Sequence, residues 1–257
     1  MISGNAPSRP THQQRFRVRS YETDPLGRLQ VHMLCKLLQE AATAHAAKLG
    51  VAVESLREAG VAWVLSHLRL RVERWPGPDA EIVVKTWPEA ANRLLVERRF
   101  EVLDRGGEVM VGATTIWLVL DLESRRPVRL PGAIAEAVAR HEIDSQPMRP
   151  ENLAGPDPAD REAVFTVRRS DLDLADHVNN TSYVEWAIEA VPHQVWVNHE
   201  PSELDISYLS ECHHGQTIVS SSRTVDGEGG LEVRHRLVRQ EDGLEVARAR
   251  TAWRPPR

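Results

Sequence analysis

The feature that most constrains this chain is that one pattern occurs twice in it. Each copy opens with a strand-like run, at residues 16–20 or 165–170, and continues through a junction into a helical pattern. The first helix is expected over 31–49, with Gly50 as its C-cap. About four strand-like segments follow each helix, at 68–72, 82–87, 94–103 and 109–120, and at 204–209, 217–219, 231–239 and 244–253.

This order predicts an α+β fold in which an antiparallel sheet wraps around one long helix, once in each copy. Too few residues remain in either copy for a second layer of helices. The predicted divisions are a disordered leader at 1–14, a first unit at 15–140, a linker at 141–162 and a second unit at 163–257. The linker is rich in Pro, Asp and Glu and has no periodicity.

Composition narrows the class of protein. No run approaches the ~18 apolar residues of a membrane span, and the polar start lacks the apolar stretch of a signal peptide. A net charge of −5 disfavours nucleic acid as a partner. The two cysteines, Cys35 and Cys212, form no disulfide framework, which predicts a cytoplasmic location.

The junction of the second copy, residues 170–183, carries the chemistry. Asp173 and His177 stand four residues apart, and Asn179 and Asn180 suit a helix start. Acid/base groups would thereby lie beside unpaired helix N–H donors. From this stretch alone, plain capping and turn residues are an equally good interpretation.

The motifs resemble those of the acyl-acyl carrier protein (acyl-ACP) thioesterases of bacteria and plants. That family has an Asp-x-Asn-x-His-Val-Asn-Asn-x-x-Tyr motif, and residues 173–183 match it except that Ala175 replaces the first asparagine. Its glutamate about thirty-four residues beyond the histidine corresponds to Glu211. Further matches lie at 20–27, 38–45, 62–66, 85–88 and 117–121, so the likeness covers about residues 15–254.

The resemblance implies two tandem hotdog folds that form an intramolecular pseudo-dimer. It implies a thioester hydrolase of fatty acid biosynthesis that releases a fatty acid from acyl carrier protein, with acyl-CoA as an alternative substrate. No cofactor and no metal are expected, and the chain is expected to be a monomer or a homodimer. The acyl chain-length preference does not follow from the sequence.

The roles implied by the resemblance are as follows. Glu211 would be the general base, His177 would hold or polarise the attacking water, and Asp173 would orient the substrate or His177. Backbone N–H groups at the helix start would face the thioester carbonyl. These donors are expected at Val178, Asn179 and Asn180.

Two alternatives stay open. Cys212 could act as a nucleophile with His177 as base and Asn179 as orienting residue. Ala175, which replaces a family asparagine, motivates a non-catalytic protein that binds acyl thioesters. A hydratase is disfavoured because its Asp-x-Asn-Pro-x-His pattern is absent. The pair His213-His214 has no second ligand pair at zinc spacing, which predicts a solvated turn.

The first copy is expected to lack the catalytic residues. Matching Ser20 to Ser170 sets Thr23 opposite Asp173 and Gly27 opposite His177, which predicts one catalytic centre per chain. The first unit would then shape the acyl-chain pocket. His45 is expected to be a core histidine. Docking of the acidic carrier protein is expected at an arginine group, either Arg93, Arg98 and Arg99 or Arg125, Arg126 and Arg129.

Overall fold

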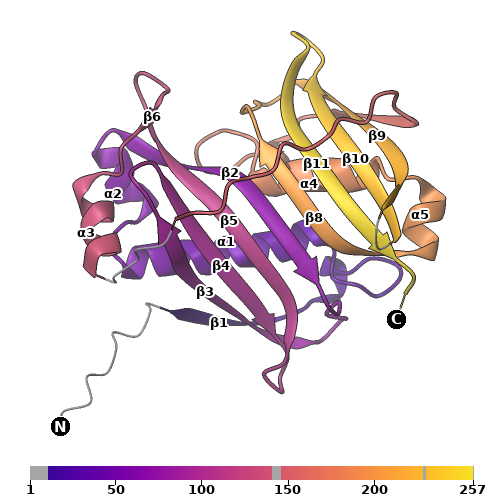
Figure 1. Cartoon of the computed structure of the whole chain (residues 1–257), viewed down its shortest axis with the longest axis horizontal. Helices are drawn as coiled ribbons and strands as arrows, with labels where there is room; N and C mark the ends of the chain where they lie inside the picture. Colours follow the sequence, from indigo (N-terminus) through magenta and orange to yellow (C-terminus); the bar gives the residue numbers. More distant parts are fainter. Residues whose placement is uncertain (1–10, 141–145, 228–229, 257) are drawn as a thin grey trace. The chain divides into compact units, whose positions relative to one another are not determined.

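The computed structural model describes residues 11–140, 146–227 and 230–256, and the chain divides into two compact units (Figure 1). The first unit comprises Met1–Leu29, Lys36–Ser66 and Arg74–Arg149. The second comprises Gln30–Cys35, His67–Glu73 and Pro150–Arg257. Helix α1 (Val31–Lys48) and strand β2 (Val61–Val72) therefore contribute residues to both units.

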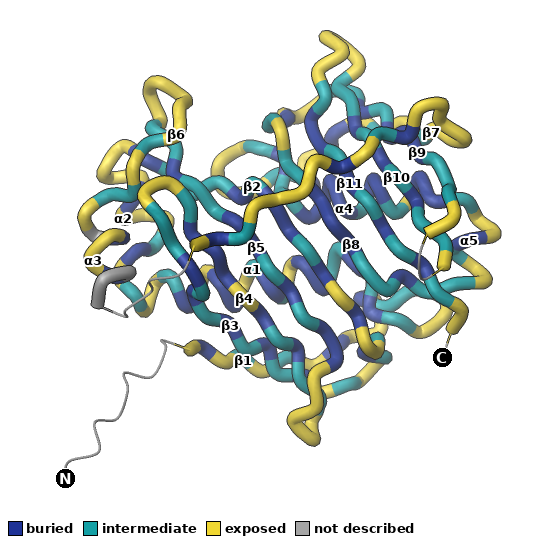
Figure 2. The backbone as a smooth tube through the Cα atoms, in the orientation of Figure 1, coloured by how far each residue is buried: buried dark blue, intermediate teal, exposed yellow. Residues whose placement is uncertain are grey.

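The first unit has the strand order β1-β3-β4-β5-β2, with β6 beside β5. Buried and half-buried residues alternate along β3, as expected for a strand with one face in the core (Figure 2). A core cluster joins Val61, Val96 and Val119 of three strands to Ile134, and Ala46 of α1 packs against it. The elements are β1 (His12–Arg17), η1 (Ser20–Glu22), α2 (Val53–Glu58), β3 (Glu81–Ala91), β4 (Leu95–Leu103), β5 (Val109–Asp121), β6 (Pro127–Val128) and α3 (Gly132–Arg140).

The second unit is an antiparallel sheet in the order β2-β8-β11-β10-β9-β7, and α4 contacts β7, β9 and β10. Val191, Val195, Val233 and Trp253 form a core cluster. The helix expected after the junction is α4. A second helix, α5, was not predicted, and it follows Pro192, which has no N–H to continue α4. The elements are β7 (Arg161–Thr166), η2 (Arg169–Asp171), α4 (Asn180–Glu189), α5 (His193–Asn198), β8 (Glu200–Tyr208), β9 (Thr217–Gly227), β10 (Gly230–Arg239) and β11 (Leu244–Arg254).

The predicted class, α+β with two tandem hotdog units, is confirmed. The first helix has the predicted start and ends one residue early, and Gly50 has the left-handed φ of 76° expected beyond a helix end. The short helices α2 and α3 were not predicted. No helix in the described residues has the length and hydropathy needed to cross a membrane.

The predicted boundaries need two corrections. The expected leader at 1–14 is wrong at its end, because residues 12–14 are paired with β3. Residues 1–10 and 141–145 lie outside the described residues. The expected linker at 141–162 includes the first two residues of β7, Arg161 and Glu162. Within it the amide of Met148 donates to the buried carboxylate of Glu97 at 2.6 Å, and Leu153 is buried.

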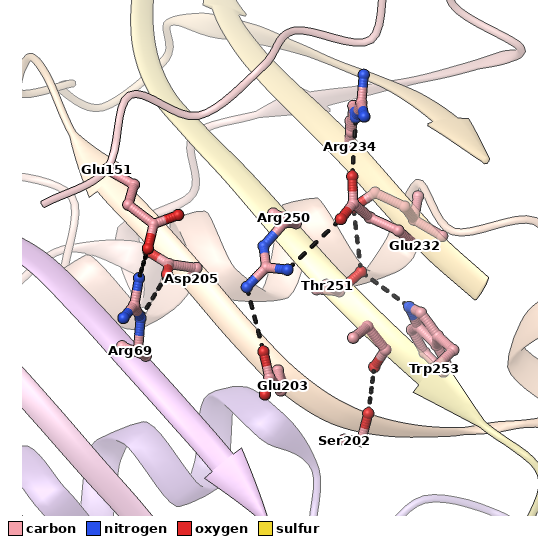
Figure 3. A network of polar contacts seen from close by, with 12 residues as sticks. Arg69, Glu151, Ser202, Glu203, Asp205, Glu232, Arg234, Arg250, Thr251 and Trp253 are labelled. Carbon is pink, nitrogen blue, oxygen red and sulfur yellow. Dashed lines mark hydrogen bonds and ion pairs between the residues drawn. The ribbon is translucent and has the colours of Figure 1, made fainter. Parts of the chain in front are cut away.

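Charged side chains on the sheet of the second unit pair across strands (Figure 3). Arg250 of β11 lies 3.1 Å from Glu203 of β8 and 3.5 Å from Glu232 of β10. Partly exposed pairs of this kind contribute only about 0–1 kcal/mol each. The carboxylate of Asp205 of β8 is buried instead, at 1% exposed, and Nε of Arg69 lies 2.6 Å from its Oδ2. Because a buried charge without a partner is costly, this ion pair matters more to stability than the exposed ones.

Candidate active site

The loop from β7 to α4 carries the predicted site, and its backbone closes on itself. After η2, an isolated bridge pairs Leu172 with Val178. Inside this bridge the amide of Asp173 donates to the carbonyl of His177 at 2.8 Å. Asp176 at the turn has a φ of 61°, a conformation that Asp tolerates. These features fix the backbone from which the His177 side chain projects.

Asp173 shapes this loop. Its Oδ1 accepts a hydrogen bond from the amide of Ala175 at 2.8 Å and a longer one from the amide of His177 at 3.4 Å. Such bonds to the following backbone are typical of Asp in turns. The described contact to His177 is therefore to its backbone, whereas the expected role was to orient the imidazole or the substrate.

The imidazole of His177 meets the carboxylate of Glu211. Nδ1 lies 3.2 Å from Oε2, and the two side chains are 29% and 39% exposed. Backbone bonds hold both segments, since the amide of Val178 donates to the carbonyl of Cys212 at 2.9 Å and Arg239 donates to the carbonyl of Glu211 at 3.1 Å. The fold thus brings two predicted catalytic side chains, thirty-four positions apart, into contact.

A third side chain, the exposed His213, joins this pair. Its ring lies edge-on to that of His177, with the ring centroids 5.0 Å apart. One ligand atom from each of His177, Glu211 and His213 lies within 4.8 Å of the others, so the three could hold a metal ion. His213 does lie in a turn, where its carbonyl accepts from the amide of Gln216. Its approach to His177 was not apparent from sequence spacing.

Cys212 is buried beneath the site. Burial raises the pKa of its thiol, against a smaller lowering by a hydrogen bond with Tyr183 and by the charge of Arg239. Among the described residues, no hydrogen bond joins the Cys212 thiol to His177. Because only the thiolate is a good nucleophile, this environment does not favour the covalent alternative.

Two of the three predicted oxyanion donors are already engaged. The amide of Val178 donates to Cys212, as noted, and the amide of Asn179 donates to the carbonyl of Asp171 at 2.8 Å. The prediction was wrong for these two groups, because the bond to Cys212 uses the amide of Val178 and the bridge that closes the loop uses the amide of Asn179.

The remaining donor is the amide of Asn180, the first residue of α4. It has no acceptor among the residues that the structure describes. The next amide, of Thr181, is capped by Oδ1 of Asn179 at 3.0 Å, which confirms the predicted N-cap. An uncapped N–H at a helix N-terminus is suited to a developing negative charge.

The first unit contains the same loop, one residue out of the expected register. Oδ1 of Asp24 accepts from the amides of Leu26 and Arg28, and the amide of Asp24 donates to the carbonyl of Arg28. Asp24 therefore matches Asp173, and Arg28 matches His177. The expected alignment, with Thr23 and Gly27 at these places, is wrong because matching two serines displaced it by one residue.

The histidine and glutamate have no counterparts in the first unit. The amide of Leu29 donates to the carbonyl of Pro76 at 2.9 Å, the same bond that the second unit makes between the residues following His177 and Glu211. Trp75 therefore stands where Glu211 stands. The first copy keeps the acid, which the sequence analysis expected it to lack, but has neither the imidazole nor its carboxylate partner. One catalytic centre per chain stays a prediction.

Arg98, proposed from sequence as a docking residue, is buried. It is 8% exposed, donates to Oγ1 of Thr86 at 3.2 Å, and places Nη1 3.0 Å from Nδ1 of His45. Burial lowers its pKa to about 10, and no carboxylate pairs with it among the described residues. It cannot belong to a docking surface, whereas His45 is the predicted core histidine. The other candidates are exposed: Arg93, Arg99, Arg125, Arg126 and Arg129.

Comparisons with known proteins bear on these features. The acyl-ACP thioesterase N-terminal domain matches residues 9–138, and the acyl-ACP thioesterase C-terminal domain matches residues 156–255. A dodecanoyl-(acyl-carrier-protein) hydrolase from Cinnamomum camphora is 29% identical over 95% of this chain and 67% of its own length. A palmitoyl-acyl carrier protein thioesterase from Gossypium hirsutum is 30% identical over 94% of this chain and 63% of its own length. The chain thus spans about two thirds of these relatives.

Solved structures of acyl-ACP thioesterases are similar to this chain along most of its length. The 12:0-ACP thioesterase from Umbellularia californica has a TM-score of 0.84 and 28% identity, and the match covers 96% of this chain and 94% of that one. An acyl-ACP thioesterase from Bacteroides thetaiotaomicron also has a TM-score of 0.84, over 95% and 98% of the two chains, and at 24% identity it shows the fold alone. Since the two matched domains together cover most of its length, the chain belongs to the acyl-ACP thioesterase family.

Proposed function

We propose that this chain hydrolyses fatty acyl-ACP thioesters to a free fatty acid and the carrier protein, with water as the nucleophile. The observation that carries this proposal is the 3.2 Å contact between His177 and Glu211 in the unit that matches the thioesterase C-terminal domain. The names of the relatives supply the substrate class, since two of them are a dodecanoyl-ACP hydrolase and a palmitoyl-ACP thioesterase.

Glu211 is the proposed general base. Its carboxylate takes a proton from a water molecule as the water oxygen bonds to the thioester carbonyl carbon. His177, in contact with the same carboxylate, holds the water in line. The C–S bond of the tetrahedral intermediate then breaks, and the sulfur leaves with the proton that the Glu211–His177 pair received. The products are a carboxylic acid and the thiol of the carrier.

The carbonyl oxygen becomes negative in the intermediate and requires a donor. The amide of Asn180 is the proposed donor, because its N–H has no acceptor among the described residues and lies at the positive end of α4. One such donor can lower the barrier by about 3 kcal/mol. Asp173 supports the reaction indirectly by holding the loop, and Cys212 needs no role.

The binding of the acyl chain and of the carrier protein is also proposed. The first unit is proposed to hold the acyl chain, and the exposed arginines are proposed to dock the carrier protein. Acyl-CoA as substrate, the monomeric or dimeric state and the cytoplasmic location also stay predictions. Both cysteines are free thiols, which supports a reducing location.

The test is thiol release from palmitoyl-ACP and octanoyl-ACP. We expect release by the wild type and a loss of about 10²- to 10⁴-fold in His177→Ala and in Glu211→Gln. The exposed residues His214 and Glu189 supply matched controls, His214→Ala and Glu189→Gln, which should keep wild-type rates. Acyl binding without release would favour the binding protein suggested by Ala175. Faster release from palmitoyl-CoA would favour the acyl-CoA alternative.

A further inference from the structure

We propose that His177, Glu211 and His213 form a binding site for a transition-metal ion of the Zn²⁺ class, and that the bound ion inhibits the enzyme. The inhibitory part rests on the function proposed above, whereas metal binding does not. Two imidazoles and a carboxylate are a known ligand set for zinc. Neither the family motif nor the predicted mechanism includes His213.

The distances suit such an ion. Zinc lies about 2.0–2.2 Å from nitrogen and oxygen ligands in tetrahedral geometry, which sets two ligand atoms roughly 3.3–3.5 Å apart. The Nδ1 atom of His177 and the Oε2 atom of Glu211 are already 3.2 Å apart. The ligand atom of His213 lies within 4.8 Å of both. Because His213 is exposed, its side chain can move the remaining distance without disturbing the core.

The backbone that carries the three ligands is held in place before any ion binds. The amide of Val178 ties the loop of His177 to the carbonyl of Cys212, which lies between Glu211 and His213 in the chain. On the other side, the amide of His213 donates to Oε1 of Gln216 at 2.8 Å. Ordering of the ligands therefore requires little backbone rearrangement, which favours binding.

The first unit shows that the fold does not require these ligands. Its equivalent loops make the same backbone bond, between Leu29 and Pro76. The positions that match His177, Glu211 and His213 there are Arg28, Trp75 and Gly77, and none of these side chains is a zinc ligand. All three ligands are thus particular to the copy that carries the proposed catalytic pair.

Occupancy by the ion would inhibit hydrolysis directly. The metal would take a lone pair of the Glu211 carboxylate that otherwise accepts the proton of the attacking water. It would also hold the imidazole of His177 away from that water. The side chains of His177 and Glu211 are partly exposed, so the ion can enter from solvent.

Zn²⁺ titration of the full chain by calorimetry tests the site. We expect one ion per chain in the wild type and in His214→Ala, and an affinity about 10- to 100-fold lower in His213→Ala, because loss of even an outer-shell partner costs that much. His214 is the matched control, since it is the exposed neighbour of His213. Equal Zn²⁺ affinity in His213→Ala and the wild type would overturn the proposal.

Thiol release with added Zn²⁺ tests the inhibition. We expect Zn²⁺ to inhibit the wild type and His214→Ala, EDTA to restore them, and His213→Ala to need about 10-fold more Zn²⁺ for the same inhibition. Inhibition is measured against the metal-free rate of each variant. Activation by Zn²⁺ would overturn the inhibitory role. Zn²⁺ binding that depends on His213 in a chain with no thiol release would refute the proposed function alone.

Discussion

Asp173 offers the sharpest test of how this site works. The structure shows it bonded to the backbone of its own loop, whereas the motif implies that it orients the substrate or the imidazole of His177. If it only shapes the loop, an oxygen acceptor is required at that position and a negative charge is not. Asp173→Asn retains Oδ1 as an acceptor for the amides of Ala175 and His177, whereas Asp173→Ala removes it.

The magnitude follows from the two bonds. The 2.8 Å bond to Ala175 should contribute about 1 kcal/mol, and the 3.4 Å bond to His177 less, because it is long and exposed. Asp173→Ala should therefore lower the free energy of unfolding by about 1–2 kcal/mol, or the Tm by roughly 2–8 °C. Its thiol release should fall as well, since the loop no longer fixes His177. Asp173→Asn should keep thiol release within about tenfold of wild type, well short of the 10²- to 10⁴-fold loss of an acid/base group.

The assay pairs thermal unfolding with thiol release from acyl-ACP. The first unit supplies the control, because Asp24 makes the same loop bonds beside Arg28 in place of a histidine. Asp24→Ala should lower the Tm by at least as much as Asp173→Ala and spare thiol release. The reasoning is refuted if Asp173→Asn keeps the wild-type Tm yet loses more than about 10²-fold in rate, because the charge itself would then be needed.

Three further predictions follow from buried groups. Arg98→Met should leave the free energy of unfolding unchanged or raise it by about 1–3 kcal/mol in urea titration, because it removes a buried unpaired charge. Arg93→Met is the exposed control, and a loss above about 2 kcal/mol in Arg98→Met would contradict this prediction. Burial raises the pKa of Asp205, but His67 and Arg69 lower it by more, so the pKa lies below its ordinary value. The ionised carboxylate therefore stabilises the fold fully above pH ~4, and this stabilisation is lost as the pH falls further. Asp205→Asn should lower the free energy of unfolding by about 3–5 kcal/mol at pH 7 and weaken its dependence on pH in the acid range. Cys212→Ala should retain near-normal thiol release, and complete loss would restore the covalent mechanism.

Much of the fold could be predicted from the sequence, because local pattern and tertiary packing agree. The first helix has a regular apolar face, and its start and its Gly50 cap match the prediction. Asn179 caps α4 as its position before an apolar helix suggests. The pairing of Glu211 with His177 was predicted only through the family motif, since the thirty-three residues between them carry no local signal.

Other features depend on geometry that a sequence pattern does not encode. The approach of His213 to His177 requires the turn at Gly215, with a φ of 81°, and the bond from the amide of Val178 to the carbonyl of Cys212, which ties the two loops together. The same bond engages the amide of Val178, and the bridge between Leu172 and Val178 engages the amide of Asn179 with the carbonyl of Asp171. A signal for the correct repeat register was present, however. Each loop opens with an arginine three residues before a buried acid: Arg19 and Glu22, and Arg168 and Asp171.

The corrected register explains how one loop serves two purposes. In the first unit, Nε of Arg28 donates to Oδ2 of its own loop acid Asp24 at 2.8 Å, and both side chains are only 12% exposed. The guanidinium binds that acid, so the two side chains of this loop pair with each other. An imidazole at the same place is shorter, and His177 instead contacts Glu211 on the neighbouring segment, where the first unit has Trp75. The two copies therefore differ at two aligned positions that must change together, because a histidine without its carboxylate would lack the base. Adding Arg28→His to a chain that carries Glu211→Gln should accordingly leave its thiol release at the level of Glu211→Gln alone, and a recovery of the rate would contradict this.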